Sequence, residues 1–223
     1  MCFDHIVETT NHFCRCCIVH NNPQNNLSDN IRKTMKKYEI IYADPPWDYK
    51  GQKQHSGKGK KDTGGAATHY PCMKLKELKA LPVPSIADDN CLLFLWATSP
   101  HLDQAIDLMK SWGFKWATVG FIWDKQRINP GFYTMSQCEL CLVGKKGKIP
   151  QPRGARNIRQ LIHSLRTRHS EKPPEARYRI ERMFPNQTKI ELFARQATKG
   201  WDVWGNEAPE PEKENIRERF FDE

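Results

Sequence analysis

The chain has 223 residues, of which 38% are apolar and 27% charged, which suits one domain with a single core and a large polar surface. No apolar run approaches the ~18 residues that a membrane-spanning helix needs, and the first residues lack the basic-then-apolar order of a signal peptide. We therefore expect an intracellular protein without membrane contact, in the cytoplasm or nucleoid, or in the nucleus of a eukaryote.

The net charge of +9 is unevenly placed. Twelve Lys or Arg against three Glu lie between residues 145 and 182, and five lysines without any acid lie between 50 and 61. Residues 207–223 have the opposite balance, with seven acids against three bases. Two basic segments in a small domain favour a polyanion such as nucleic acid as partner, although an ordinary solvated surface has the same composition.

Residues 1–37 are polar and rich in Asn, and we expect a partly looped N-terminal extension. Zinc sites usually need two separated ligand pairs, and no second pair follows the cysteines and histidines of this extension, so no metal is predicted. These residues are His12, Cys14, Cys16, Cys17 and His20. Residues 50–68 hold five glycines and five lysines, which predicts a long loop of the kind that often covers or binds a ligand.

The chain otherwise alternates predicted strands and helices. The strands are 38–43, 91–98, 115–125, 137–146, 188–195 and 201–207, and the helices are 75–81, 99–112 and 173–184. Ser99 should cap its helix, Pro100 should lie in the first turn and Gly113 should end it. The strands are continuous apolar runs, which is typical of a mostly parallel sheet in an α/β domain, where ligands bind at the carboxyl ends of strands.

Several aromatic and sulfur side chains are interpreted as packing residues. Cys138 and Cys141 form a CxxC, but inside a predicted strand, where a thiol behaves as a small hydrophobe. The tryptophans that we assign to the core are Trp96, Trp112, Trp116 and Trp123. There is no GxGxxG and no phosphate-binding Gly-rich loop, which argues against the usual dinucleotide enzymes and nucleotide triphosphatases.

The sequence ADPPW, residues 43–47, ends the first predicted strand, because proline cannot donate a hydrogen bond to a sheet. The Asp44 carboxylate and the Pro45 carbonyl supply two acceptors in a rigid arc, which match an NH₂ group. Trp47 would add a flat face on which a base can stack. A turn with a helix-capping Asp44 and a core Trp47 is the alternative interpretation.

ADPPW resembles the catalytic motif of amino-group methyltransferases that use S-adenosylmethionine. The segments that follow it in order are THYPCMKLKEL, NCLLFLWAT, CELCLVGKKG, HSEKPPE, IERMFPNQTKIELFAR and WDVWGNE. Together they resemble the adenine-N6 methyltransferases related to the catalytic subunit of the eukaryotic messenger-RNA methyltransferase. The resemblance covers residues 38–208 as a methyltransferase domain and leaves out 1–37 and an acidic tail at 209–223.

This resemblance implies a Rossmann-like fold with helices on both faces of the sheet. The motif order is circularly permuted, so that the catalytic motif precedes the cofactor motif. It also implies that the enzyme binds S-adenosylmethionine and needs no metal. The catalytic residues would be Asp44, Pro45, Pro46 and Trp47, and the cofactor contacts would be Asp44, Lys172, Arg195, Thr198, Asn206 and Glu207.

Single matches differ in strength. Lys172 matches the lysine that reaches the methionine carboxylate of the cofactor, and Tyr70 matches an aromatic residue at the mouth of the site. Arg195 and Asn206 match contacts with the ribose and adenine of the cofactor. Thr198 and Glu207 replace an Asn and a Gln of the messenger-RNA enzyme and are the weaker matches. Lys172 and Arg195 could alternatively be surface charges in a basic segment.

The target amine is hidden in a duplex, so the base must be flipped out or single-stranded. The side chains expected to hold phosphates are Lys53, Lys58, Lys60, Lys61, Arg153, Arg156, Arg159, Arg166 and Arg168. A compact chain without zinc fingers resembles the prokaryotic and phage DNA enzymes, which favours DNA. An RNA adenosine methyltransferase and a non-catalytic nucleic-acid-binding partner subunit stay open as alternatives, as do a homodimer and a heterodimer.

Overall fold

The structure is a computed structural model that describes residues 36–48, 72–129, 133–165 and 171–205. All of them belong to one compact unit, Met35–Glu223. Residues 1–35 of the predicted N-terminal extension, the lysine-rich loop at 50–68 and the acidic tail at 209–223 lie outside the described residues. Within the described part of the chain, no helix combines the length and the apolar character needed to cross a bilayer.

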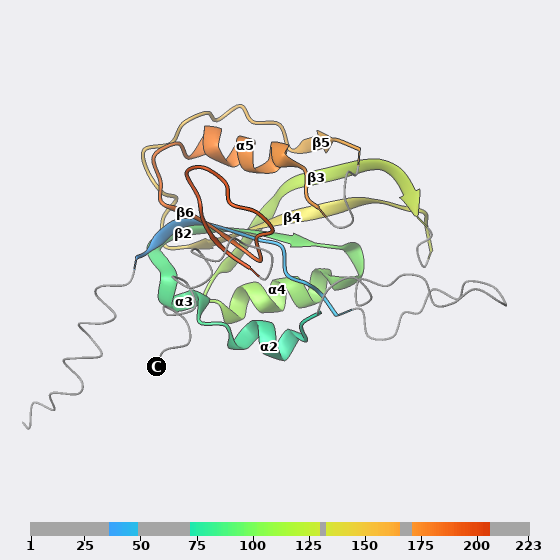
Figure 1. Ribbon diagram of the computed structural model, residues 1–223, viewed down its shortest axis with the longest axis horizontal. Helices are drawn as coiled ribbons and strands as arrows, with labels where there is room; N and C mark the ends of the chain where they lie inside the picture. Colours follow the sequence, from blue (N-terminus) through green and yellow to red (C-terminus); the bar gives the residue numbers. More distant parts are fainter. Residues whose placement is uncertain (1–35, 49–71, 130–132, 166–170, 206–223) are drawn as a thin grey trace, which may run out of the picture. The chain divides into compact units, whose positions relative to one another are not determined.

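One mixed sheet of seven strands forms the centre of the fold, in the order β5-β3-β4-β2-β1-β6-β7 (Figure 1). The strands are β1 Tyr38–Ala43, β2 Ala87–Ala97, β3 Lys115–Asn129, β4 Ser136–Lys146, β5 Leu161–His163, β6 Lys189–Leu192 and β7 Asp202–Trp204. β4 is antiparallel to β2 and β3, and every other pair of neighbours is parallel. All strands except β4 therefore end at the same edge, which we call the carboxyl edge. The predicted α/β fold with a mostly parallel sheet is confirmed.

Helices cover both faces of this sheet (Figure 1). They are α2 Leu75–Ala80, α3 Val83–Ile86, η2 Ser99–His101, α4 Leu102–Ser111 and α5 Pro174–Met183. Ile41 and Leu95 pack in the cluster that contains residues of α2 to α4, whereas Ile40 and Phe94 pack in the cluster that contains residues of α5. Successive strand residues point to opposite faces, so two covered faces explain why the strands are apolar throughout.

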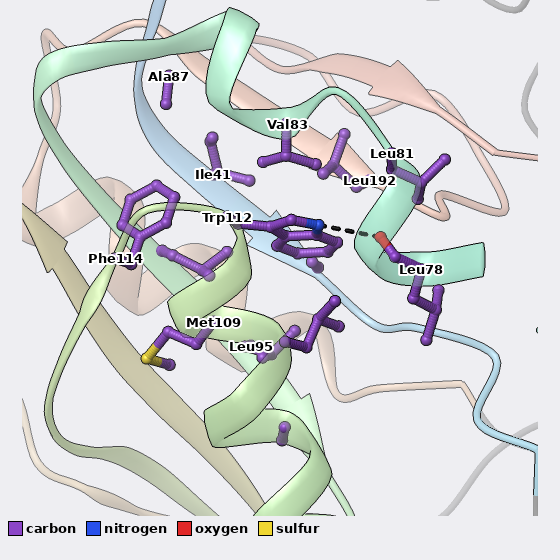
Figure 2. Close-up of a cluster of buried hydrophobic side chains, with 14 of the residues drawn as sticks. Ile41, Leu78, Leu81, Val83, Ala87, Leu95, Met109, Trp112, Phe114 and Leu192 are labelled. Atoms are coloured by element: carbon purple, nitrogen blue, oxygen red, sulfur yellow. Dashed lines mark hydrogen bonds between the residues drawn. The ribbon is translucent and has the colours of Figure 1, made fainter. Parts of the chain in front are cut away.

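The helix predicted at 99–112 packs its apolar stripe on the sheet as α4. Trp112 at its end is fully buried, and its indole N–H donates to the Leu78 carbonyl of α2 at 3.0 Å (Figure 2). Gly113, with φ of +82°, ends the helix as predicted. The prediction that Ser99 caps α4 is wrong, because Ser99 begins a 3-10 turn for which no side chain provides a cap.

β5 was not predicted from the sequence, and β6 ends earlier than predicted, while β2 begins before residue 91 and β3 continues to Asn129. β5 lies in the basic segment between residues 145 and 182, where no strand was predicted because three residues are too short an apolar run to recognise. β6 ends at Leu192 and not at residue 195, because Phe193 has φ of +62°. Left-handed backbone of this kind cannot continue a strand.

Trp96, Trp112 and Trp123 are buried as predicted, but Trp116 is 51% exposed. The cause is the shortness of β5, which pairs with β3 only at residues 122–124 and leaves the first half of β3 without a neighbour on that side. Cys141 is fully buried in β4 as predicted, and burial raises the pKa of its thiol well above the ordinary value.

Candidate active site

Asp44 leaves the sheet at the carboxyl edge, directly after the central strand β1. Ala43, the last residue of β1, pairs with Leu95 of β2 on one side and Leu192 of β6 on the other. Asp44 therefore emerges next to the ends of both neighbouring strands. In open α/β sheets this is the place where ligands bind.

Two backbone hydrogen bonds hold the Pro-Pro turn that follows. The Trp47 N–H donates to the Pro45 carbonyl at 2.9 Å, and the Met73 N–H donates to the Pro46 carbonyl at 2.9 Å. The proline rings already fix φ, so these bonds leave the turn little freedom. A carbonyl has two lone pairs, and Pro45 therefore keeps acceptor capacity for a second donor.

Trp47 packs inside the fold. It is 5% exposed, and its indole N–H donates to the Trp96 carbonyl at 3.2 Å. Its ring stacks on His101, with centroids 5.7 Å apart and an interplanar angle of 19°. Burial lowers the pKa of His101, so the imidazole stacks in its neutral form. The interpretation of Trp47 as an open stacking surface is therefore corrected, since this indole anchors the catalytic turn to the core.

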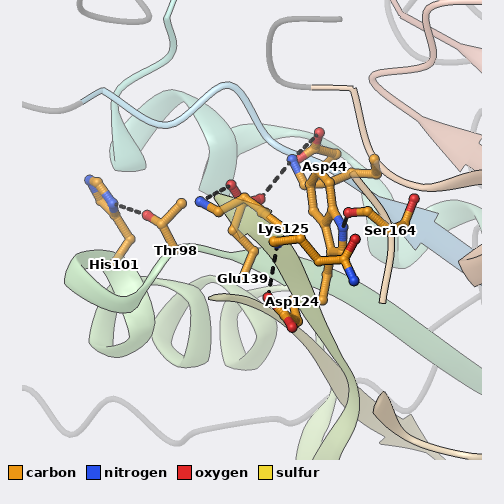
Figure 3. A network of polar contacts seen from close by, with 10 residues as sticks. Asp44, Thr98, His101, Asp124, Lys125, Glu139 and Ser164 are labelled. Carbon is orange, nitrogen blue, oxygen red and sulfur yellow. Dashed lines mark hydrogen bonds and ion pairs between the residues drawn. The ribbon is translucent and has the colours of Figure 1, made fainter. Parts of the chain in front are cut away.

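Four side chains of alternating charge form a chain of contacts beside the turn (Figure 3). The Lys172 ammonium lies 2.7 Å from Asp44 Oδ2 and 3.3 Å from Glu139 Oε2. Glu139 Oε1 lies 3.3 Å from the Lys125 ammonium. We call Asp44, Lys172, Glu139 and Lys125 the ion chain. Asp44 follows β1, Lys172 precedes α5, Glu139 lies in β4 and Lys125 lies in β3, so only the tertiary fold brings them together.

Burial and pairing set the charges of the ion chain. Burial raises the pKa of Asp44 above its ordinary value, and the cations Lys172 and Arg195 offset this only in part. Burial acts on Glu139 in the same direction, but Lys172 and Lys125 outweigh it and hold the pKa of Glu139 below its ordinary value. Burial alone would lower the pKa of Lys172, yet its two carboxylate partners raise it. Asp44 is therefore the carboxylate of the chain that a proton reaches first as the pH falls.

Aromatic side chains of β1 and β2 pack against the ion chain. The Trp96 indole N–H donates to the Tyr42 hydroxyl at 2.7 Å, and the Lys172 ammonium lies 5.8 Å from the centroid of the Trp96 ring. Burial raises the pKa of Tyr42 well above its ordinary value, so the hydroxyl stays neutral. A cation near an indole face is stabilised by the ring, which helps to keep Lys172 in place.

The turn after β6 places Arg195 at the same carboxyl edge. Phe193 adopts φ of +62° immediately after the strand, and the chain then passes close to Gly205 at the end of β7. A Cβ on Gly205 would lie 2.3 Å from the carbonyl oxygen of Ala194 and 2.4 Å from its nitrogen. Only glycine fits this approach, so the two strand ends stay together.

Comparison with known proteins assigns this site to a family. The model of the MT-A70 family matches residues 38–207, which is most of the chain. The chain belongs to the MT-A70 family. The family predicted from the order of the motifs is thereby confirmed, and with it the enzyme class, an adenine-N6 methyltransferase.

Relatives of very different size share this MT-A70 domain. The chain is 52% identical over 185 residues to the Type II methyltransferase M.MunI of Mycoplasma sp., which covers 78% of this chain and 79% of the relative. It is 32% identical over 181 residues to the N(6)-adenosine-methyltransferase MT-A70-like protein of Drosophila melanogaster, covering 77% of this chain and 27% of the relative. Its identity to the human N(6)-adenosine-methyltransferase catalytic subunit METTL3 is 29% over 181 residues, covering 77% and 28%. The chain thus spans about a quarter of the length of these two animal relatives.

The structure brings together part of the predicted MT-A70 site. Asp44 and Lys172 are in direct contact, Arg195 lies at the same edge, and Thr198 is half-buried in the connection from β6 to β7. The other predicted residues lie outside the described part of the chain, and their roles stay predictions. They are Lys53, Lys58, Lys60, Lys61, Tyr70, Arg166, Arg168, Asn206 and Glu207.

Arg153 and Arg156 lie at the opposite edge of the sheet. They belong to the connection from the end of β4 to the start of β5, and both of these ends face away from the carboxyl edge. The Gly154 N–H donates to the carbonyl of Met183, the last residue of α5. A helix of this length is about 15 Å long, which separates the two arginines from Lys172 at its start. A phosphate contact there would need nucleic acid that also extends along α5.

Two members of the ion chain, Glu139 and Lys125, were missed from the sequence. Both lie in predicted strands of otherwise apolar character, and Glu139 even lies inside a segment that carried the family resemblance. Charged side chains are almost never buried unless they are paired. An acid or a lysine within a buried strand could therefore have indicated a buried ion pair. The partner in that pair can be identified only from the fold.

The described residues contain no group of His, Cys, Asp or Glu arranged to hold a metal ion. Cys138 and Cys141 are three positions apart in β4, so their side chains point to opposite faces of the sheet and cannot share a ligand. The cysteines and histidines of the N-terminal extension lie outside the described residues.

Proposed function

We propose that this MT-A70 protein transfers the methyl group of S-adenosylmethionine to the N6 amine of adenine in DNA. The observation that carries the proposal is the setting of Asp44. A rigid turn presents its carboxylate at the carboxyl edge, and Lys172 occupies Oδ2. Among the described residues, no partner occupies the other oxygen, so Oδ1 is available to accept a hydrogen bond from an amine.

The charged groups of this edge fit the chemistry of S-adenosylmethionine. The Lys172 ammonium suits the carboxylate of the cofactor, Asp44 suits its amino group, and the Arg195 guanidinium suits its ribose hydroxyls. Thr198, Asn206 and Glu207 follow along the same connection and strand end as further contacts. When bound there, S-adenosylmethionine supplies a methyl group activated by a positively charged sulfur.

Asp44 and Pro45 make the amine of the base reactive. The lone pair of the N6 atom is delocalised into the adenine ring, so the free amine is a poor nucleophile. Hydrogen bonds from its two N–H groups to Asp44 Oδ1 and to the Pro45 carbonyl oxygen localise that lone pair on the nitrogen. Positive charge develops on the nitrogen as the C–N bond forms and the methyl group leaves the sulfur of the cofactor, which becomes a neutral thioether. The Asp44 carboxylate stabilises the charge on the nitrogen in a poorly solvated site.

The raised pKa of Asp44 adds to this role. A carboxylate whose pKa lies above its ordinary value is a better acceptor for the proton that the methylated nitrogen must lose. The pKa of Glu139 is lowered and that of Lys172 is raised, so both groups keep their charges as Asp44 titrates. Holding amine and methyl donor in line supplies much of the remaining rate.

DNA is favoured as substrate because a relative that is 52% identical, and of which the match covers 79%, is named a Type II methyltransferase. The alternative is adenosine in RNA, since several relatives are named N(6)-adenosine-methyltransferases. A non-catalytic partner subunit is the second alternative, but the intact Asp44 and its contact with Lys172 argue for an enzyme. Size-exclusion chromatography with light scattering distinguishes a monomer from a homodimer; a heterodimer needs a second chain.

One experiment tests the substrate and the reaction together. The protein is incubated with labelled S-adenosylmethionine and with matched single-stranded and double-stranded DNA and RNA, and the nucleosides are then separated. N6-methyladenine in deoxynucleosides is the expected product, and label confined to ribonucleosides would move the proposal to RNA. Asp44→Ala should still bind the cofactor in calorimetry and yet transfer no methyl group. Transfer by this variant would contradict the assigned role of Asp44.

A further inference from the structure

Lys125 is a buried cation for which the reaction above has no direct use. It is 7% exposed, and Glu139 is the one ion-pair partner of its ammonium among the described residues, at 3.3 Å. Removing an ammonium from water costs several kcal/mol unless a counter-ion compensates. An apolar side chain would fill this space at lower cost, so the charge at this position needs a reason.

Hydrogen bonds of the neighbouring residue, Asp124, hold the backbone at Lys125 on the side away from Glu139. The neighbouring Asp124 accepts hydrogen bonds from the backbone N–H of Gln126 at 2.9 Å and from the side-chain amide of Gln137 at 2.6 Å. Its other carboxylate oxygen lies 3.1 Å from His163 Nδ1 of β5. These contacts tie β3 to β4 and β5 at the level of the ion chain. They fix the backbone of β3 at this point, and the Lys125 side chain extends from it toward Glu139 (Figure 3).

We propose that Lys125 is a positioning residue of the active site that acts through Glu139. Its ammonium holds one oxygen of the Glu139 carboxylate, and the other oxygen of that carboxylate holds Lys172 beside Asp44. Lys125 thus fixes how Lys172 divides its contacts between the two carboxylates. The inference rests on the proposed function, because it concerns how Asp44 is prepared for methyl transfer.

The charged groups around Asp44 enter this balance, and one of them, Glu191 of β6, is already paired with Arg177 at 2.7 Å. Lys172 and Arg195 favour the ionised carboxylate, whereas Glu139 opposes it. The Tyr42 hydroxyl and the Cys141 thiol, which also pack here, are neutral. Without the Lys125 ammonium, the Glu139 charge is compensated by Lys172 alone. Lys172 is then drawn toward Glu139, and both carboxylates retain a proton to higher pH.

Lys125→Met should therefore shift the pH profile of methyl transfer. We expect the acid limb of kcat to move to higher pH by about 0.5–1 unit, since a single charge in contact shifts a pKa by ~1–3 units and Lys125 acts one residue further away. On the alkaline plateau kcat should stay within about threefold of the wild type. Lys125→Arg, which keeps the charge, should restore the original profile. Lys145→Met, the same change at an exposed position of β4, is the matched control.

A double-variant cycle identifies the route of the effect. If Lys125 acts through Glu139, Lys125→Met should add nothing to Glu139→Gln, whereas independent effects would add. Additive losses, an unmoved acid limb, or a change confined to KM for the nucleic acid would each overturn the proposal. If Lys125→Met does not fold, Lys125→Gln keeps a donor toward Glu139 without the charge and takes its place.

A second measurement separates this inference from the proposed function. The affinity for S-adenosylmethionine is measured by calorimetry as a function of pH, because Lys172 belongs to both the ion chain and the proposed cofactor site. Lys125→Met should shift this profile in the same direction as the rate profile. Failure of the wild type to methylate any nucleic acid would refute the proposed function, while the calorimetric profile would still decide whether Lys125 sets the balance.

Discussion

Asp44→Asn tests whether the charge of the carboxylate, and not only its acceptor oxygen, drives methyl transfer. The amide keeps the size of the side chain and one acceptor, so the N6 amine can still be held. The attraction between a carboxylate and the positive charge that develops on the nitrogen is lost. At ~4 Å and an effective dielectric constant of ~20 this attraction amounts to about 4 kcal/mol. Removing one preorganised partner of a developing charge typically costs ~2.7–4 kcal/mol, so kcat should fall about 10²–10³-fold.

The assay is the single-turnover rate of labelled methyl transfer, measured with cofactor affinity by calorimetry and with thermal unfolding. Lys172 keeps Glu139 as a counter-ion in this variant, so the free energy of unfolding should change by no more than about 1 kcal/mol. Asp107→Asn is the matched control, because Asp107 also pairs with a lysine, Lys79, but is 54% exposed. An exposed pair contributes ~0–1 kcal/mol to stability and should have no effect on the rate.

One result would refute the reasoning. If Asp44→Asn transferred methyl groups within about tenfold of the wild-type rate while binding the cofactor normally, the carboxylate charge would have no part in the transition state. A large loss of stability would instead show that Asp44 is needed to compensate Lys172 in the fold.

Three further predictions concern pH, backbone packing and salt. The rate of transfer should fall as the pH drops through the pKa of Asp44, which burial raises above its ordinary value; a kcat profile records this acid limb, and Asp44→Asn should lack it. Gly205→Ala puts a methyl group 2.3 Å from the Ala194 carbonyl oxygen and should cost ~1–3 kcal/mol of stability and weaken cofactor binding. The control is Gly200→Ala, where nothing lies within 4 Å and only the positive φ is strained, at about 1 kcal/mol. The third prediction concerns nucleic-acid binding measured at a series of salt concentrations. Alanine at the loop lysines should lower the slope of log K against log salt by ~0.9 for each phosphate that is no longer neutralised. Alanine at Arg153 and Arg156 should leave this slope unchanged. The loop lysines are Lys53, Lys58, Lys60 and Lys61.

The layered fold could be predicted because a strand that is buried on both faces is apolar at successive positions. Ile40 and Ile41 are apolar neighbours that face opposite sides of the sheet, and no amphipathic strand has that pattern. The antiparallel direction of β4 could not be predicted, since parallel and antiparallel strands of a covered sheet have the same composition. β5 was missed because its three residues lie in a basic segment.

The catalytic turn illustrates what local residues can and cannot establish. The apolar run and the two prolines after it were enough to predict that a strand ends before Asp44 and that the Asp44 carboxylate lies at the strand end. The same residues suggested an open indole at Trp47, because an aromatic after a turn has no obvious neighbour in the sequence. His101 and Trp96, which bury it, come from the end of β2 and the turn that follows.

The sequence by itself determined the family, the rigid Asp-Pro-Pro turn, and the pairing of that turn with a later lysine and arginine as one candidate site. It did so because these are properties of residue type and order. Only the tertiary structure decided which charges meet, since Lys125, Glu139 and Lys172 approach Asp44 from three separate elements. The charge that each of these groups carries depends on its burial and its partner, and both are created when the sheet and α5 pack together.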